Sequence, residues 1–83
     1  MYKLSSRVLR KRGDPLRVKV ESDREVMLNL LDSAGQVVWK QKAPAMSNAW
    51  WNVPVQDYTG VGAAYVRISA GSFEKVVGIV VRP

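Results

Sequence analysis

A chain of 83 residues is long enough for one small domain, but it leaves little room for a deep, enclosed active site. Hydrophobic residues make up 47% of it, which is ordinary for a folded protein and argues against wholesale disorder. It has no cysteine and no histidine, which excludes disulfides, cysteine-based zinc sites and thiol or imidazole catalysis.

The net charge of +6 is concentrated at the N-terminus. Residues 1–19 carry seven Lys or Arg against one acidic residue, Asp14, whereas residues 20–83 carry six charges of each sign. Gly13, Asp14 and Pro15 are typical turn residues between these two parts. We therefore expect a basic N-terminal arm over residues 1–13 and a neutral domain over residues 14–83.

Apolar and charged residues alternate over residues 16–20, which predicts a half-buried strand. A second strand is expected over residues 26–31. The residues 32–35 read Asp-Ser-Ala-Gly and predict a hairpin turn, in which Gly35 takes the left-handed conformation. The return strand is then expected over residues 36–42, which are rich in residues that favour strands.

Three more strands are expected over residues 49–55, 63–70 and 73–81, separated by loops that contain glycine or proline. No segment has the period of a helix. Six short strands at this spacing predict an all-β protein, and we favour a small antiparallel immunoglobulin-like sandwich of six to seven strands with a basic N-terminal arm. A small β-barrel is the alternative.

A hairpin and two later strands carry a family resemblance. The pattern runs Leu28-x-Leu30-x-Asp32-x-x-Gly35-x-Val37-Val38, then Trp51, then Gly60 and Ala64-Tyr65-x-Arg67-Ile68. It resembles the immunoglobulin-like domains of flagellar hook-capping proteins and of bacterial C-terminal secretion-sorting domains, over about half of the chain. The resemblance implies the sandwich fold.

The acidic residues fall in predicted turns or at solvent-facing positions, an arrangement that seldom holds two carboxylates across one cleft. The usual activated nucleophiles and general bases are missing, and Gly60-x-Gly62 lacks the third glycine and the helix of a phosphate-binding loop. We therefore expect no catalytic residues, no metal site and no cofactor, and a protein that is not an enzyme.

The cations of the arm have three interpretations. They could bind nucleic acid by displacing counterions from phosphate, or reach over an acidic protein neighbour, or simply stay solvated. The strands of the domain are neutral, which argues against a barrel that grips nucleic acid with cations on its strands. The arm residues proposed to bind a partner are Arg7, Arg10, Lys11 and Arg12.

Two strands have apolar residues on both faces, although a sheet with one wet face should alternate cleanly. We expect the outer face to be covered, either by Val8 and Leu9 of the arm or by another subunit. Because Trp50 and Trp51 are adjacent, one must point outward, and we expect Trp51 in the core. The predicted apolar contact surface consists of Met27, Leu31, Trp50, Val76 and Val80.

The function we expect is that of a non-enzymatic structural module. It would dock through the arm and the apolar face on a larger protein assembly, such as a virion capsid or tail or a bacterial surface apparatus, or associate with itself. The alternatives are a small basic nucleic-acid-binding β-barrel and a carbohydrate-binding module that uses the Trp50 region. No stretch is apolar enough for a signal peptide or membrane insertion, so a cytoplasmic or virion location is expected, and an extracellular one only for an excised domain.

Overall fold

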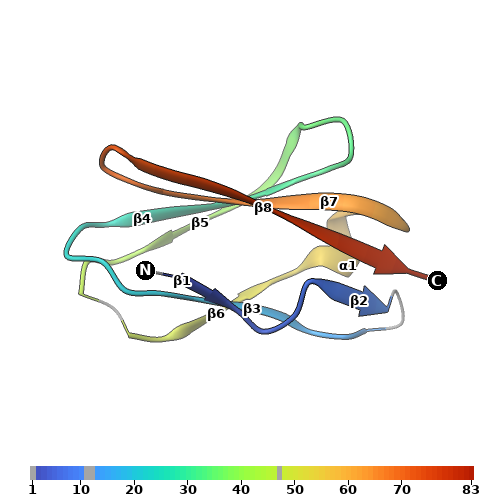
Figure 1. Ribbon diagram of the computed structural model, residues 1–83, viewed down its shortest axis with the longest axis horizontal. Coiled ribbons are helices and arrows are strands. Elements are labelled where there is room, and N and C mark those ends of the chain that lie inside the picture. Colours follow the sequence, from blue (N-terminus) through green and yellow to red (C-terminus); the bar gives the residue numbers. More distant parts are fainter. Residues whose placement is uncertain (1, 11–12, 47) are drawn as a thin grey trace.

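The computed structural model describes residues 2–10, 13–46 and 48–83, and these residues form two sheets packed face to face (Figure 1). One sheet has three strands in the order β1-β3-β6, and the other has five in the order β2-β8-β7-β4-β5. The strands are β1 (Tyr2–Leu4), β2 (Val8–Arg10), β3 (Leu16–Val20), β4 (Val26–Leu31), β5 (Val37–Ala43), β6 (Trp50–Val53), β7 (Gly62–Ala70) and β8 (Phe73–Arg82).

The strand order confirms the predicted sandwich. The chain crosses between the sheets after β1, β2, β3, β5 and β6. The strands β8, β7 and β4 lie opposite β3 and β6, as in immunoglobulin-like domains. Every pairing is antiparallel except that of β2 with β8, which is parallel. Both sheets are open at their edges, so the fold is not the barrel that was the alternative.

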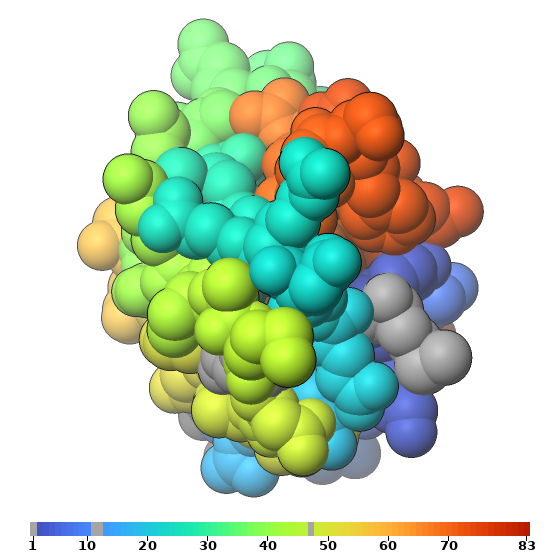
Figure 2. Space-filling model, turned by 90° about the vertical axis from the view of Figure 1, so that its left-hand side faces the viewer, coloured from blue at the N-terminus to red at the C-terminus, as the bar shows by residue number. Residues whose placement is uncertain are grey.

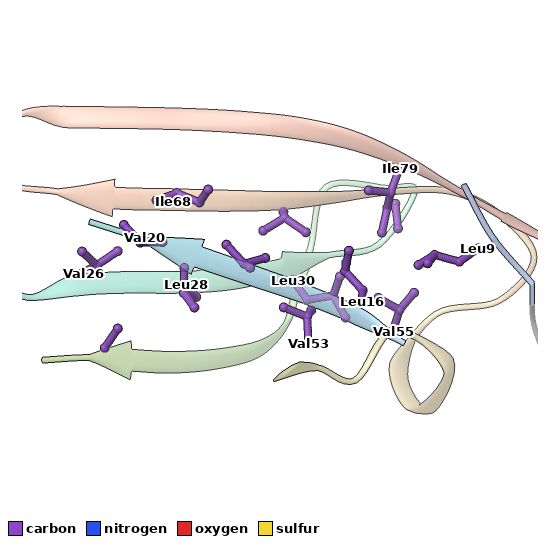
Figure 3. Close-up of a cluster of buried hydrophobic side chains, with 14 of the residues drawn as sticks. Leu9, Leu16, Val20, Val26, Leu28, Leu30, Val53, Val55, Ile68 and Ile79 are labelled. Carbon is purple, nitrogen blue, oxygen red and sulfur yellow. The ribbon is translucent and has the colours of Figure 1, made fainter. Parts of the chain in front are cut away.

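The core lies between the sheets because the strands alternate as their sequences predict. Inward-facing residues of β3, β4, β7 and β8 are almost fully buried, and they meet across the sandwich (Figure 3). Each buried aliphatic side chain stabilises the fold by about 1.5–3 kcal/mol relative to an exposed one. The inward set includes Leu16, Val18, Val20, Val26, Leu28, Leu30, Val66, Ile68, Val77, Ile79 and Val81.

The described residues 2–10 of the expected arm contribute a strand to each sheet. Strand β1 pairs with β3, and strand β2 pairs with the end of β8 near the C-terminus (Figure 1). Leu9 is only 1% exposed and lies at the same end of the core as Val55 and Ile79 (Figure 3). Leu9 therefore does not cover an outer face, which was one of the two possibilities left open, because the alternation of β2 turns it into the interior while Val8 points outward.

The turn between β4 and β5 has the predicted chemistry. Gly35 has a φ of 84°, which only glycine adopts without strain, and its N–H donates to the carbonyl of Asp32 at 3.0 Å. The Asp32 carboxylate accepts from the N–H groups of Ala34 and Gln36 at 3.0 and 2.9 Å. These three hydrogen bonds fix the hairpin.

A short helix, α1 (Val55–Tyr58), follows β6 where the sequence predicted the end of a strand and a loop. Val55 is fully buried and anchors it, and Thr59 closes it by donating from its N–H and its hydroxyl to the Val55 carbonyl, both at 2.9 Å. Gln56 donates from Nε2 to the carbonyls of Arg10 and Asp14, which ties α1 to the turn after β2. In the described part of the chain, no helix is long and apolar enough to cross a membrane.

The opposite end of the sandwich is closed by loops. The loop after β3 lies against the loop after β5, and the β7–β8 turn lies above them (Figure 2). The N–H of Met46 donates to the carbonyl of Ser22 at 2.9 Å and links the first two loops. The outer surfaces of the two sheets carry exposed apolar side chains, which makes them the main candidates for a binding site.

Replacing Leu9 with alanine tests whether β2 is part of the fold. We expect Leu9→Ala to lower the free energy of unfolding by about 2–5 kcal/mol, because it leaves a cavity between the sheets. The neighbouring Val8 is 48% exposed, so Val8→Ala should change it by no more than about 0.5 kcal/mol. Chemical denaturation of both variants measures the difference, and equal small effects would show that β2 does not pack on the core.

Candidate functional site

The outer face of the five-stranded sheet is assigned by the pairing registers, since paired residues point to the same side and neighbours along a strand alternate. Leu28 and Leu30 of β4 point inward, so Met27, Asn29 and Leu31 point outward. The register carries this assignment across the sheet. The outward residues include Val8 and Arg10 on β2, Val76, Gly78, Val80 and Arg82 on β8, Ala63, Tyr65, Arg67 and Ser69 on β7, and Lys40 and Lys42 on β5.

Valines form the centre of this face. Val8 pairs with Val80, and Val80 pairs in turn with Ala63, so three strands place small apolar side chains in one row. Val80 is 45% exposed, and Val76, which lies beyond Gly78 on the same side of β8, is 48% exposed. We call this outer surface, centred on Val8, Val76 and Val80, the valine face.

The next row of the valine face, formed by Leu31, Tyr65 and Gly78, is less exposed to solvent than the row of Val8 and Val80. Tyr65 pairs with both Leu31 and Gly78, and its ring carbons lie 3.8 and 3.9 Å from the point where a Cβ on Gly78 would be. Leu31 also pairs with Val37 and is only 7% exposed although it lies on the outer face. The protein itself therefore covers Leu31, whereas it leaves the valines of β2 and β8 open.

Cations surround these valines on two sides. Arg10 pairs with Arg82 at the end of β2 and β8, next to the Val8–Val80 pair. On the opposite side Lys40 and Lys42 lie outward on the edge strand β5. Like charges placed side by side gain nothing from one another, so these groups are suited to an acidic partner.

Arg67 has a structural role on the same face. Its Nε and Nη2 donate at 3.2 Å to the side-chain oxygen of Asn29, when that amide is oriented to suit its neighbours, and its Nε lies 3.7 Å from Glu74. Asn29 is buried despite pointing outward, so its amide needs this partner. Arg67 is thus committed within the fold, unlike the exposed Arg10 and Arg82.

The structure brings together only some of the residues predicted to bind a partner. Met27, Leu31, Val76 and Val80 share the outer face of the five-stranded sheet, and Arg10 joins them through the pairing of β2 with β8. Arg7 is exposed, and its carbonyl accepts from the N–H of Val80 at 2.8 Å. Lys11 and Arg12 lie outside the described residues.

Trp50 does not belong to this surface. It points outward as predicted, but from the three-stranded sheet, where Lys19 is its partner on β3. Trp51 packs against the core, also as predicted. The grouping of Trp50 with Val76 and Val80 was wrong because an outward direction on a strand does not tell which sheet the strand joins.

Several members of the valine face were not predicted from the sequence. Val8 was treated as a residue of the arm, and Ala63, Tyr65 and Val37 were not singled out. Tyr65 could have been found from alternation, since it lies between the inward-facing Ala64 and Val66. Val37 could not, because a β-bulge shifts the register there and turns it to the face opposite Trp39. Val8 could not, because a strand of three residues is too short to show a period.

Within the described ranges, no group of three or more acidic residues is placed to hold a metal ion. Comparison of the sequence with models of protein families and with curated proteins finds no match. The resemblance to hook-capping and secretion-sorting domains stays a prediction. The geometry of the two outer faces is therefore the basis for assigning a function.

Removing the guanidinium of Arg67 should expose the dependence of Asn29 on it. We expect Arg67→Leu to lower the free energy of unfolding by about 1–3 kcal/mol, because a buried amide loses its partner. Arg82→Leu, which removes an exposed cation of the same face, should change it by no more than about 0.5 kcal/mol. The double variant Asn29→Leu/Arg67→Leu should recover most of the loss in thermal unfolding; no recovery would contradict the proposed pairing.

Proposed function

We propose that this chain is a non-enzymatic assembly module that docks on a protein partner through the valine face. The observation that carries the proposal is the row of open apolar side chains that runs across β2, β8 and β7 beside a pair of arginines. An apolar centre with a charged and polar rim is the usual anatomy of a protein interface. The Val8, Ala63 and Val80 row provides such a centre, and Arg10 and Arg82 provide part of the rim.

Burial of the exposed valines supplies a driving force for docking. Val8, Val76 and Val80 each keep nearly half of their surface in contact with water. Covering apolar area stabilises a complex by roughly 25 cal/mol per Å², before the costs of association are subtracted. Short side chains such as valine also lose little conformational freedom when they are covered.

The charges favour an acidic partner over a second copy of this chain. In a symmetric dimer each patch meets itself, so the Arg10 and Arg82 of one copy would approach the cations of the other. The whole chain has a net charge of +6, which adds to this repulsion. The partner we propose has aliphatic or aromatic residues surrounded by Asp and Glu.

A peptide library displayed on phage, selected on the immobilised protein, tests this proposal. We expect the recovered binders to combine acidic residues with an aliphatic or aromatic centre. Val76→Ser and Val80→Ser should each weaken them by about tenfold or more. Met46→Ser is the control, because Met46 is 77% exposed in the loop between β5 and β6 and contacts the loop after β3, and it should leave binding unchanged.

Two results would overturn the proposal. Binders that tolerate Val76→Ser and Val80→Ser would place recognition elsewhere. Sedimentation at low salt is expected to show a monomer; a dimer that is lost in Val80→Ser would make a second copy the occupant of the valine face in place of an acidic partner.

A further inference from the structure

The outer face of the three-stranded sheet has a different chemistry. Lys3 pairs with Lys19, and Lys19 pairs with Trp50, so these three side chains form one row across β1, β3 and β6. Arg17 pairs with Asn52 in the next row. We call the outward surface of Lys3, Arg17, Lys19, Trp50 and Asn52 the tryptophan face.

Trp50 is the large exposed aromatic residue of this face. It is 48% exposed, although a tryptophan is the largest apolar side chain and is usually well buried. It lines an open depression of about 390 Å³ together with Ser5, Arg17 and Asn52. The depression thus has one aromatic wall, one cation and two small polar side chains.

The charge of this face is positive, although the strands of the domain were expected to be neutral, because β1 joins β3 and adds Lys3 to Arg17 and Lys19. Lys3, Arg17 and Lys19 all point outward from neighbouring strands. The acidic residue that lies near them is Glu21, whose carboxylate is 4.0 Å from the ammonium of Lys19 at the end of β3. Arg17, which borders the depression, is exposed.

We propose that the tryptophan face binds single-stranded nucleic acid, with a base stacked on Trp50 and phosphates held by Arg17, Lys19 and Lys3. An exposed aromatic ring among cations on a sheet is how proteins bind single strands without sequence preference. A single strand carries both an unpaired base and the adjacent phosphates, so it satisfies both features of the site. Asn52 is placed to hydrogen-bond a base edge or a sugar.

Two other ligands fit less well. A neutral carbohydrate could stack on Trp50, but it would leave three cations without a role. Duplex DNA could meet the cations, but its bases are stacked in the helix and are not available to the ring. The site lies on the opposite side of the sandwich from the valine face. A negative result for one face therefore does not test the proposal for the other.

The test is the binding of a fluorescein-labelled oligothymidylate of about 12 nucleotides, followed by anisotropy and by quenching of tryptophan fluorescence. Trp50→Ala should weaken binding roughly 5- to 150-fold, and Trp50→Phe should retain part of the affinity because phenylalanine still stacks. Phe73→Ala is the matched control, since Phe73 is equally exposed but lies on the other sheet, and it should have no effect.

A second set of measurements varies the charge of the protein and the salt concentration. Arg17→Ala should weaken binding more than Arg82→Ala, which removes the same charge from the valine face. Contacts to three phosphates predict that the logarithm of the binding constant falls against the logarithm of salt with a slope of about −2. Circular dichroism of each variant confirms that it is folded.

Three outcomes would overturn the inference. Trp50→Ala and Phe73→Ala could bind alike, which would reduce the binding to general attraction by a basic protein. The duplex of the same length could bind as tightly as the single strand, which would exclude stacking. Heparin could bind more tightly than the oligonucleotide and depend on Trp50, which would make an acidic polysaccharide the ligand.

Discussion

The pairing of β2 with the end of β8 is the interaction on which both surfaces of this protein depend. It places Leu9 between the sheets, and the alternation of the strand then turns Val8 and Arg10 outward next to Val80 and Arg82. Strand β1, which precedes β2 in the chain, belongs to the other sheet, where it places Lys3 beside Lys19. A segment of nine residues therefore contributes to the core, to the valine face and to the tryptophan face at once. Any change that detaches it should disturb all three.

The size of the domain explains why so much chemistry lies on the outside. With 83 residues, the two sheets provide only one core between their inner surfaces, and each outer surface faces solvent. The protein covers part of one outer surface with its own side chains, as Tyr65 does for Gly78 and Arg67 does for Asn29. Where no long side chain extends over the valines, they stay open. Function in such a small sandwich is therefore expected on the faces of its sheets.

Much of the fold could be predicted because its signals are local. The alternation in residues 16–20 and 26–31, the hairpin at Asp32 and Gly35 and the opposite directions of Trp50 and Trp51 all follow from the period of a strand or the conformation of a turn. These predictions are confirmed. The two three-residue strands and the four-residue α1 could not be predicted, since each is too short to show a period and is held by contacts far away in the sequence, such as that of Gln56 with the Arg10 carbonyl.

The candidate sites were predictable only as single residues and not as surfaces. Alternation identified Trp50, Val76 and Val80 as outward-facing, but membership of a sheet depends on which strands cross the sandwich, and that is set by the packing of the whole chain. The cations were likewise predictable as single residues but not as members of a surface. Counted along the sequence, Lys3 and Arg17 belong to one basic segment with Arg10, whereas the fold separates Lys3 and Arg17 to one side and Arg10 to the other.

This separation of charge has a physical consequence for binding. An anionic partner of the valine face would meet cations beside an aliphatic surface, where burial of apolar area would supply the energy. An anionic partner of the tryptophan face meets cations beside an aromatic ring, where stacking supplies it. The same net charge of +6 would steer both partners toward the protein, and the neutral side chains at the centre of each face would discriminate between them. Because the two faces belong to different sheets on opposite sides of the core, an occupant of one face would leave the other open if both proposals hold.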